Sequence, residues 1–219
     1  PAAMEPAVGG EPMPAPEPDG RIRVGILSAF LRQHTVSRLY AGWIEKLDRR
    51  RFKVFGYHTG GFVDRTSELI ARQCDAFHFV GRDILARTDR PYDGRIAEVC
   101  RVVAADRPHV LLFPEIGMDP TTLFLAALKL APVQAAGIGH PTTTGLPTMD
   151  YFLSGALIEP EGAEAHYSET LVRLPNISVR LFDSGVAPKR KRRSRADFGF
   201  AEGEIVYVSP QSLMKYRPC

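Results

Sequence analysis

The sequence lacks the marks of several protein classes. Its three cysteines, Cys74, Cys100 and Cys219, lie far apart and form no C-x-x-C pair. Neither a zinc site nor a disulfide framework is indicated, so we expect a protein of the reducing cytoplasm. No apolar run approaches the roughly 18 residues that span a bilayer, and residues 1–20 contain no apolar core of a signal peptide. We therefore expect no association with a membrane.

Charge of one sign is also scarce. The formal net charge is only +3, and six cations are gathered at residues 189–195. The rest of the chain is close to neutral, which argues against a nucleic-acid-binding face. The basic run itself is most often a solvated linker, and a nuclear signal or an RNA contact is the less favoured interpretation.

The composition is nevertheless that of a folded α/β protein. Apolar residues make up 44% and charged residues 24% of 219, enough for one good-sized domain with appendages. Residues 1–20 are rich in Pro, Ala and Glu and are expected to be a disordered linker. Beyond them, strand and helix patterns alternate, which predicts a mostly parallel sheet with helices on both faces. Strands are expected at 21–28, 52–58, 76–80, 108–113, 132–139 and 150–154, and helices at 35–47, 64–73, 92–105 and 120–130.

The pattern weakens after Pro175. Residues 176–198 show almost no apolar periodicity, so we expect an exposed and mobile connection there. A further strand is expected at 204–208, and one strand without a sheet cannot form a domain. The chain is thus expected to end inside a second domain. The expected organisation is a linker at 1–20, a first lobe at 21–180, a basic interlobe linker at 181–203 and the start of a truncated second lobe at 204–219.

The residues that follow the expected strand 132–139 suggest a ligand site. Gly139, His140 and Pro141 are followed there by three threonines and Gly145. Ligands bind beyond the carboxyl ends of parallel strands, and glycine permits close approach of the backbone while threonine hydroxyls suit phosphate or sugar oxygens. A plain turn between two strands is the alternative, and we favour the site. The first strand, in contrast, is not followed by G-x-G-x-x-G, so the dinucleotide-binding fingerprint is absent.

Two histidines are further candidates. His34 lies between the first strand and its helix, where an imidazole can act as a base or bind phosphate. The alternative, in which Thr35 caps the helix and His34 is a solvated loop residue, stays open. His109 opens a strand, on the edge opposite the usual site, so its residues alone favour a structural histidine held by a backbone bond.

Glu115 and Asp119 could form a pair of carboxylates for acid/base work. Asp119 stands directly before Pro120, however, which favours a helix N-cap with proline at the first helical position. The role of Glu115 stays open.

These segments together resemble the catalytic region of the O-linked N-acetylglucosamine transferase family, especially its bacterial members that follow tetratricopeptide repeats. The related bacterial protein N-glucosyltransferases form a second branch. The similarity covers nearly the whole chain after residue 20, in the family's order. The matching stretches are 21–25, His34 to Leu39, 53–57, 108–111, 131–134, 139–145, 149–151, 167–175 and 211–216.

The resemblance implies a GT-B enzyme, whose active site lies between two Rossmann-like lobes, and which inverts the anomeric centre of a UDP-sugar without a metal or other cofactor. It implies UDP-GlcNAc or UDP-glucose as donor and a protein as acceptor, on Ser/Thr or alternatively on Asn. A noncatalytic α/β interaction domain and a GT-B transferase for lipids or small glycans are the rival interpretations. The implied catalytic residues are His34 and His109, and the implied donor-binding residues are Gly139, His140, Pro141, Gln211 and Lys215.

The match to the family has two departures. Glu115, Ile116 and Gly117 differ from the pattern of the animal enzymes, and His140 stands where those have an aromatic residue. Both features are closer to the bacterial branches, so the donor sugar stays open. Because half a cleft cannot align donor and acceptor, the chain alone is expected to be inactive.

Overall fold

The computed structural model describes residues 20–80, 92–185 and 192–210. The chain divides into two compact units, residues 1–186 and 187–219. No helix within the described ranges is long and apolar enough to cross a membrane.

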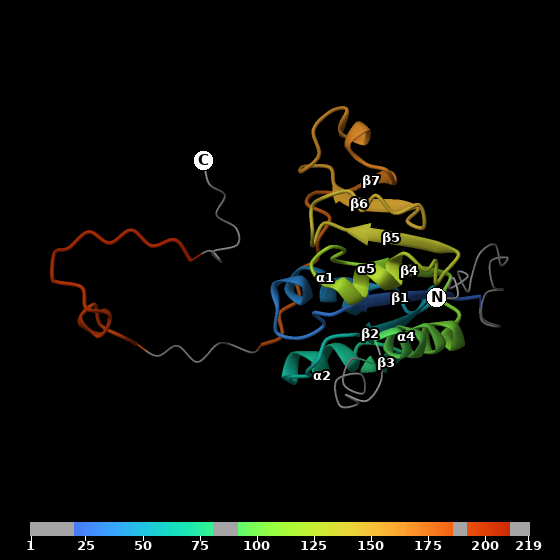
Figure 1. Ribbon diagram of the computed structural model, residues 1–219, viewed down its shortest axis with the longest axis horizontal. Coiled ribbons are helices and arrows are strands. Elements are labelled where there is room, and N and C mark those ends of the chain that lie inside the picture. Colours follow the sequence, from blue (N-terminus) through green and yellow to red (C-terminus); the bar gives the residue numbers. More distant parts are fainter. Residues whose placement is uncertain (1–19, 81–91, 186–191, 211–219) are drawn as a thin grey trace. The chain divides into compact units, whose positions relative to one another are not determined.

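The first unit is built on one parallel sheet of seven strands, in the order β3-β2-β1-β4-β5-β6-β7. The first three strands are added in one direction and the later ones in the other, so the strand order reverses between β1 and β4 (Figure 1). The predicted α/β fold with a parallel sheet is confirmed. The strands are β1 (Ile22–Ser28), β2 (Phe52–His58), β3 (Ala76–His78), β4 (Val110–Phe113), β5 (Val133–Gly137), β6 (Tyr151–Gly155) and β7 (Thr170–Leu174).

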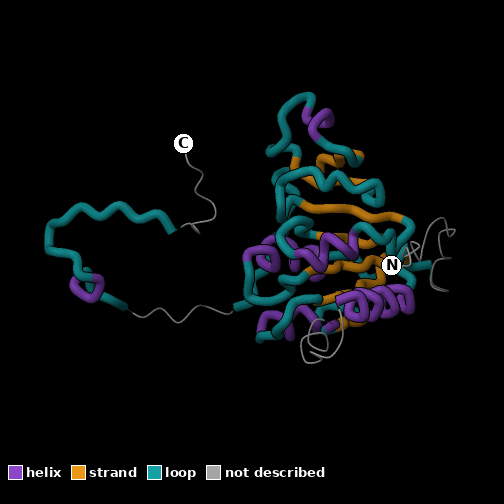
Figure 2. Tube along the Cα trace, in the orientation of Figure 1, coloured by secondary structure: helices purple, strands orange, loops and turns teal. Residues whose placement is uncertain are grey.

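Helices cover both faces of this sheet (Figure 2). The helices α1 (Thr35–Lys46) and α2 (Arg65–Ala71) pack on one face, against Val24, Ile26 and Leu112. The helices α4 (Tyr92–Asp106) and α5 (Pro120–Ala126) pack on the other face, against Leu27 and Phe113. Successive strand residues point to opposite faces, so each strand feeds both apolar cores. Two short 3-10 helices follow, η1 (Ala163–His166) and, in the second unit, η2 (Ala196–Phe198).

Helix α5 is shorter than predicted, ending at Ala126 instead of Leu130. The side chain of Gln134 explains the early end, because its amide donates to the carbonyl of Ala126 and accepts from the backbone N–H of Leu130. Lys129 then adopts a left-handed backbone with φ of 46°. A side chain just beyond the helix thus takes over the hydrogen bonds that would have continued it.

The structure differs from the prediction at the end of the first unit. The edge strand β7 was not expected, because Thr170–Leu174 is only half buried and shows no clean alternation. Beyond it, Ser178 is buried, and the N–H groups of Arg180 and Phe182 donate to carbonyls of α1. Most of residues 176–185 are exposed, as predicted, but this first part of the connection is tied to α1 by backbone hydrogen bonds.

The second unit shows no strand at 204–208 among its described residues. Ile205, Tyr207 and Val208 are exposed there. The strand prediction followed the β-branched composition of this segment, but no neighbouring strand in the described part of the chain pairs with it. A strand needs a partner for its backbone groups, so composition alone was misleading.

Candidate functional site

The reversal of strand order between β1 and β4 marks the place where an open parallel sheet binds ligands. Three loops leave the carboxyl ends of neighbouring strands there. We call them the β1–α1 loop (residues 29–34), the β4–α5 loop (residues 114–119) and the β5 loop (residues 138–145). The candidate site is built from these loops.

His34 ends the β1–α1 loop and is itself the N-cap of α1. Its backbone is extended, with φ of −154°, and its Nδ1 accepts a hydrogen bond from the N–H of Val36 at 3.2 Å. The alternative with Thr35 as the cap is wrong, since Thr35 is already the first helical residue. The ring of His34 stacks on Phe30 with centroids 4.3 Å apart.

This geometry decides what His34 can do. Burial, and then the nearby Arg32 guanidinium, lower the pKa of the imidazole, so the ring is neutral at pH 7. Because Nδ1 accepts from a backbone N–H, the proton of the neutral ring resides on Nε2. The half-buried ring therefore offers an N–H donor to an oxygen of a ligand, and it serves as a base only if the bond to Val36 opens.

Glu115 is the side chain at this edge whose role the sequence left open. It is 1% exposed, and its Oε1 accepts from the hydroxyl of Ser28 at 2.9 Å and from the N–H of Ala29 at 3.1 Å. Its Oε2 has no hydrogen-bond partner among the described residues. Burial raises the pKa of Glu115 to about 8, against the lowering effect of the Ser28 and Ala29 hydrogen bonds. The carboxyl is thus neutral at pH 7.

Asp119, which the sequence also offered as a partner carboxylate, is the N-cap of α5 and accepts from the N–H of Thr122 at 3.1 Å. The prediction of a cap at this position is confirmed.

The β5 loop packs directly on the β4–α5 loop. The N–H of Gly139 donates to the carbonyl of Pro114 at 2.9 Å, and a Cβ at Gly139 would lie 2.4 Å from that oxygen. Only glycine fits so close an approach. The ring of His140 lies against Gly117, which has φ of 97°. Pro141 follows and is exposed. The predicted donor-loop residues of the first lobe therefore lie beside Glu115, at the same edge as His34.

The threonines of the β5 loop have a partner that the sequence did not reveal. Glu169, 6% exposed, accepts from the hydroxyl of Thr143 at 2.8 Å and from the N–H of Thr144 at 2.8 Å, and also from the Thr144 hydroxyl. Thr143 in turn accepts from the N–H of Ser168 at 3.0 Å. These hydroxyls hold the loop in shape, so the expectation that they face a phosphate or sugar is not supported for Thr143 and Thr144.

His109 lies elsewhere. It is 4% exposed at the amino end of β4, and its Nδ1 accepts from the N–H of Arg23 at 2.8 Å. This is the opposite edge of the sheet from His34 and His140, because all strands are parallel. The contacts are those of a structural histidine, as its position in the sequence favoured, and they give no support to the catalytic role implied by the family resemblance.

Two buried residues near the site escaped sequence reasoning. His58, at the end of β2, is fully buried between the carbonyls of Ser28 and Phe62, with ring nitrogens 3.3 Å and 2.9 Å from them. Tyr40 points from α1 toward Gly137, and its hydroxyl has no hydrogen-bond partner among the described residues. The only sequence feature that could have pointed to them is their position: His58 is the last residue of a strand, and Tyr40 lies on the helix that follows the first strand.

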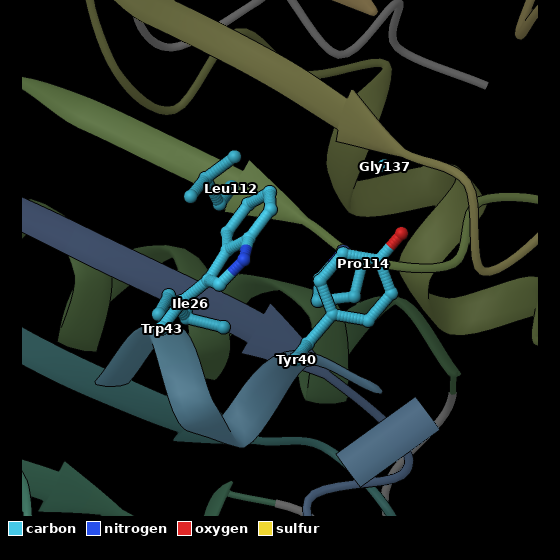
Figure 3. Close-up of a pocket in the computed structure, with 6 residues that line it drawn as sticks. All are labelled: Ile26, Tyr40, Trp43, Leu112, Pro114 and Gly137. Carbon is cyan, nitrogen blue, oxygen red and sulfur yellow. The ribbon is translucent and has the colours of Figure 1, made fainter. Parts of the chain in front are cut away.

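Tyr40 also lines a small pocket between α1 and the strand ends (Figure 3). The lining is largely apolar and offers few groups to a sugar or a phosphate. The pocket is formed by Ile26, Tyr40, Trp43, Leu112, Pro114 and Gly137.

Gln211 and Lys215, the remaining predicted donor-binding residues, lie outside the described residues. Within the described ranges, no three side chains of the His, Cys, Asp and Glu types gather in a way that could hold a metal ion.

Comparison with known proteins supplies the family. Residues 12–180 match glycosyl transferase family 41. Two UDP-glucose:protein N-beta-glucosyltransferases of Actinobacillus pleuropneumoniae are similar, one 32% identical over 66% of this chain and 21% of its own, the other 28% identical over 90% and 29%. A probable UDP-N-acetylglucosamine–peptide N-acetylglucosaminyltransferase of Arabidopsis thaliana is 24% identical over 90% of this chain and 20% of its own.

A solved structure agrees with this assignment. A mutant of the O-GlcNAc transferase of Thermobaculum terrenum superposes with a TM-score of 0.64 and 26% identity, over 77% of this chain and 31% of that one. The chain thus spans about a fifth to a third of the length of these relatives. The family match covers most of the chain, and the α/β fold agrees with it: the chain belongs to glycosyl transferase family 41.

Proposed function

We propose that the polypeptide to which this chain belongs transfers a sugar from a UDP-sugar to a protein side chain in the cytoplasm. The observation that supports this most is the meeting of the His34, Glu115 and Gly139–His140 loops where the strand order reverses, in a chain of family 41. The favoured reaction is transfer of GlcNAc to Ser or Thr, by direct displacement and without a metal or other cofactor.

In this reaction His34 directs its Nε2–H at an oxygen of the acceptor or of the donor. A fixed donor in a desolvated cleft stabilises charge that develops on that oxygen in the transition state. Gly139, His140 and Pro141 line the donor, and Gln211 and Lys215 bind its diphosphate, where the lysine neutralises the leaving group. His109 has no part in this arrangement.

Transfer of glucose to Asn is the second candidate. It is favoured by the two Actinobacillus relatives, which are named as UDP-glucose:protein N-beta-glucosyltransferases. The departures at 115–117 and at His140 from the animal pattern leave the donor sugar open between the two candidates.

The test is a transfer assay with a longer polypeptide that contains residues 1–219. It is incubated with protein acceptors and either UDP-GlcNAc or UDP-glucose, with and without a metal chelator. Mass spectrometry then identifies the added sugar and the modified residue. Transfer that needs a metal would contradict the metal-independent reaction. Absence of transfer from either donor would favour the noncatalytic interaction domain. Residues 1–219 alone are the negative control, since they span 31% of the solved relative.

The role of His34 is tested in the same assay with a matched pair of variants. Asparagine is a good N-cap and alanine is not, so His34→Asn should keep the stability of α1 while His34→Ala loses about 1 kcal/mol. Both should lower kcat by about 10²–10³-fold, because both remove the Nε2–H. Near-normal turnover of His34→Asn would show that His34 only caps the helix.

A further inference from the structure

Glu115 joins the candidate site to the β1–α1 loop through side-chain hydrogen bonds. Its Oε1 binds the Ser28 hydroxyl and the Ala29 N–H, and the Ser28 oxygen accepts in turn from the N–H of Phe30 at 2.9 Å. Phe30 stacks on the ring of His34. A short chain of contacts therefore runs from the Glu115 carboxyl to the imidazole.

Glu115 also packs against the β5 loop, at Gly139. A Cβ at Gly139 would lie 3.1 Å from the Cβ of Glu115, so the two residues are in close contact. The preceding carbonyl, that of Pro114, accepts from the N–H of Gly139. The carbonyl of Glu115 itself accepts from the Thr122 hydroxyl at 3.4 Å, which ties the residue to α5. Residue 115 thus contacts both loops in different ways: its carboxyl binds the β1–α1 loop, while its Cβ and the preceding carbonyl of Pro114 lie against Gly139 of the β5 loop.

The burial of Glu115 shows why this arrangement is sensitive. Oε1 accepts two hydrogen bonds, so the proton of the neutral carboxyl resides on Oε2, which has no partner among the described residues. Loss of that proton would place a charge with an unpaired oxygen in the core, a costly state unless the surroundings move.

We infer that Glu115 is a positioning residue of the proposed transfer site: its carboxyl fixes the β1–α1 loop that carries His34, against the β5 loop on which its Cβ packs. The inference rests on the proposed function for its role in transfer, but the coupling of the two loops is a property of this chain. Glu115 is too buried to touch a substrate, so it acts through His34 and Gly139.

Several titratable groups lie near Glu115, although burial is the main reason that its pKa is raised. Asp119 opposes its ionisation from the head of α5, and Tyr40 lies near it on α1. His58 contacts the carbonyl of Ser28, and His140 packs on the β4–α5 loop. With the pKa of Glu115 at about 8, the β1–α1 loop should be held below this pH and loosened above it.

Hydrogen exchange of the purified 219-residue chain measures this coupling on both sides of pH 8, after correction for the intrinsic rate. Glu115→Ala removes the acceptor of the Ser28 and Ala29 hydrogen bonds, so it should raise exchange in the peptide 29–34 by about tenfold or more. The peptide 138–145 should change less, because alanine keeps the Cβ and the backbone that lie against Gly139. Glu115→Gln mimics the neutral carboxyl. Its exchange rates should therefore stay close to those of wild type below pH 8, and they should not show the increase that wild type shows above pH 8. Ser28→Ala should loosen only the β1–α1 loop. Asp106→Asn, which changes a carboxylate on the other edge of the sheet, is the matched control and should change neither loop.

In a longer polypeptide that transfers sugar, Glu115→Ala should lower kcat more than it changes KM. Glu115→Gln should keep most of the turnover and remove the decline above pH 8. Unchanged exchange in both loops of Glu115→Ala would overturn the inference. It would also be overturned if exchange in Glu115→Gln still increased above pH 8 as it does in wild type. If Glu115→Ala does not fold, Ser28→Ala decides: faster exchange confined to 29–34 supports the coupling, and unchanged exchange overturns it. If no longer polypeptide transfers sugar, the proposed function fails, while the exchange result still decides the coupling.

Discussion

Removal of the Glu169 carboxylate should unfasten the β5 loop and destabilise the first unit. Glu169 is buried and accepts from the Thr144 N–H, the Thr144 hydroxyl and the Thr143 hydroxyl. A hydrogen bond to a charged group contributes about 1.5–3 kcal/mol, but the two hydroxyls can turn to water once the carboxylate is gone. We therefore expect Glu169→Ala to lower the free energy of unfolding by about 2–4 kcal/mol, less than the sum of three bonds. For a unit of this size that lowers Tm by roughly 4–16 °C.

The pH dependence gives a second, independent signature. Although burial raises it, the hydrogen bonds from Thr144 and Thr143 lower the pKa of Glu169 below its ordinary value of 4.5. A carboxyl with a depressed pKa in the folded state stabilises above its ordinary pKa, and this contribution is lost as the pH falls through the folded-state pKa. The stability difference between wild type and Glu169→Gln should thus be full near pH 7 and shrink below pH 4.5.

Thermal unfolding of the 219-residue chain across this pH range measures both effects. Glu161→Gln is the matched control, because Glu161 is exposed close by and its replacement should change stability by less than about 0.5 kcal/mol. The reasoning is refuted if Glu169→Ala and Glu161→Gln have the same Tm near pH 7. It is also refuted if the stability difference between wild type and Glu169→Gln stays the same below pH 4.5.

Two further outcomes are expected. Gly139→Ala should lower the free energy of unfolding by about 1–3 kcal/mol and disturb the site, because the new Cβ would lie 2.4 Å from the Pro114 carbonyl oxygen. Gly145→Ala is its control: the new Cβ meets nothing within 4 Å, so only the left-handed backbone costs about 1 kcal/mol. Equal losses in thermal unfolding would contradict this reasoning. Limited trypsin digestion should cut first in the basic run 189–195 and leave a core that begins near residue 21 and ends shortly after Phe182, which packs on the first unit. Resistance at 189–195 under conditions that cut residues 1–20 would mean that the boundary is misplaced.

The layout of the first unit could be predicted from the sequence because it depends on local patterns. The strand Phe52–His58 agrees with its predicted bounds, and the predicted cap at Asp119 depends on a residue next to the helix that it starts. Errors arose where a particular hydrogen bond, and not the local apolar pattern, decides the structure. Gln134 ends α5 through its side chain, and backbone hydrogen bonds from Arg180 and Phe182 tie to α1 a segment that has no periodicity of its own. Such partners leave no signal in the local pattern.

The candidate site shows the same division at the level of single residues. The edge on which Gly139 and His140 lie follows from strand order, so it could be predicted once a parallel sheet was expected. The choice among the polar residues on that edge could not, because it depends on which side chains are buried and on what they face. Glu169 reads in the sequence as an ordinary acidic residue, yet it holds the loop whose threonines suggested a phosphate site.

For this reason the structure favours a role at the site for Glu115, whose role the sequence left open, and a structural role for His109, which the family resemblance implied to be catalytic. The imidazole of His109 could act in catalysis, but its Nδ1 accepts a hydrogen bond from the backbone N–H of Arg23 in the first strand. It also lies at the amino ends of the strands, away from the loops of the candidate site. Glu115 carries a carboxyl that solvent cannot reach, which excludes direct contact with a substrate but lets it tie two loops together. A buried carboxyl costs stability when it ionises, so we expect Glu115 to contribute more through the β1–α1 loop that it positions than through the core that it occupies. The hydrogen bonds that join Glu115 to Ser28 and Ala29 are therefore where the fold and the proposed reaction depend on each other.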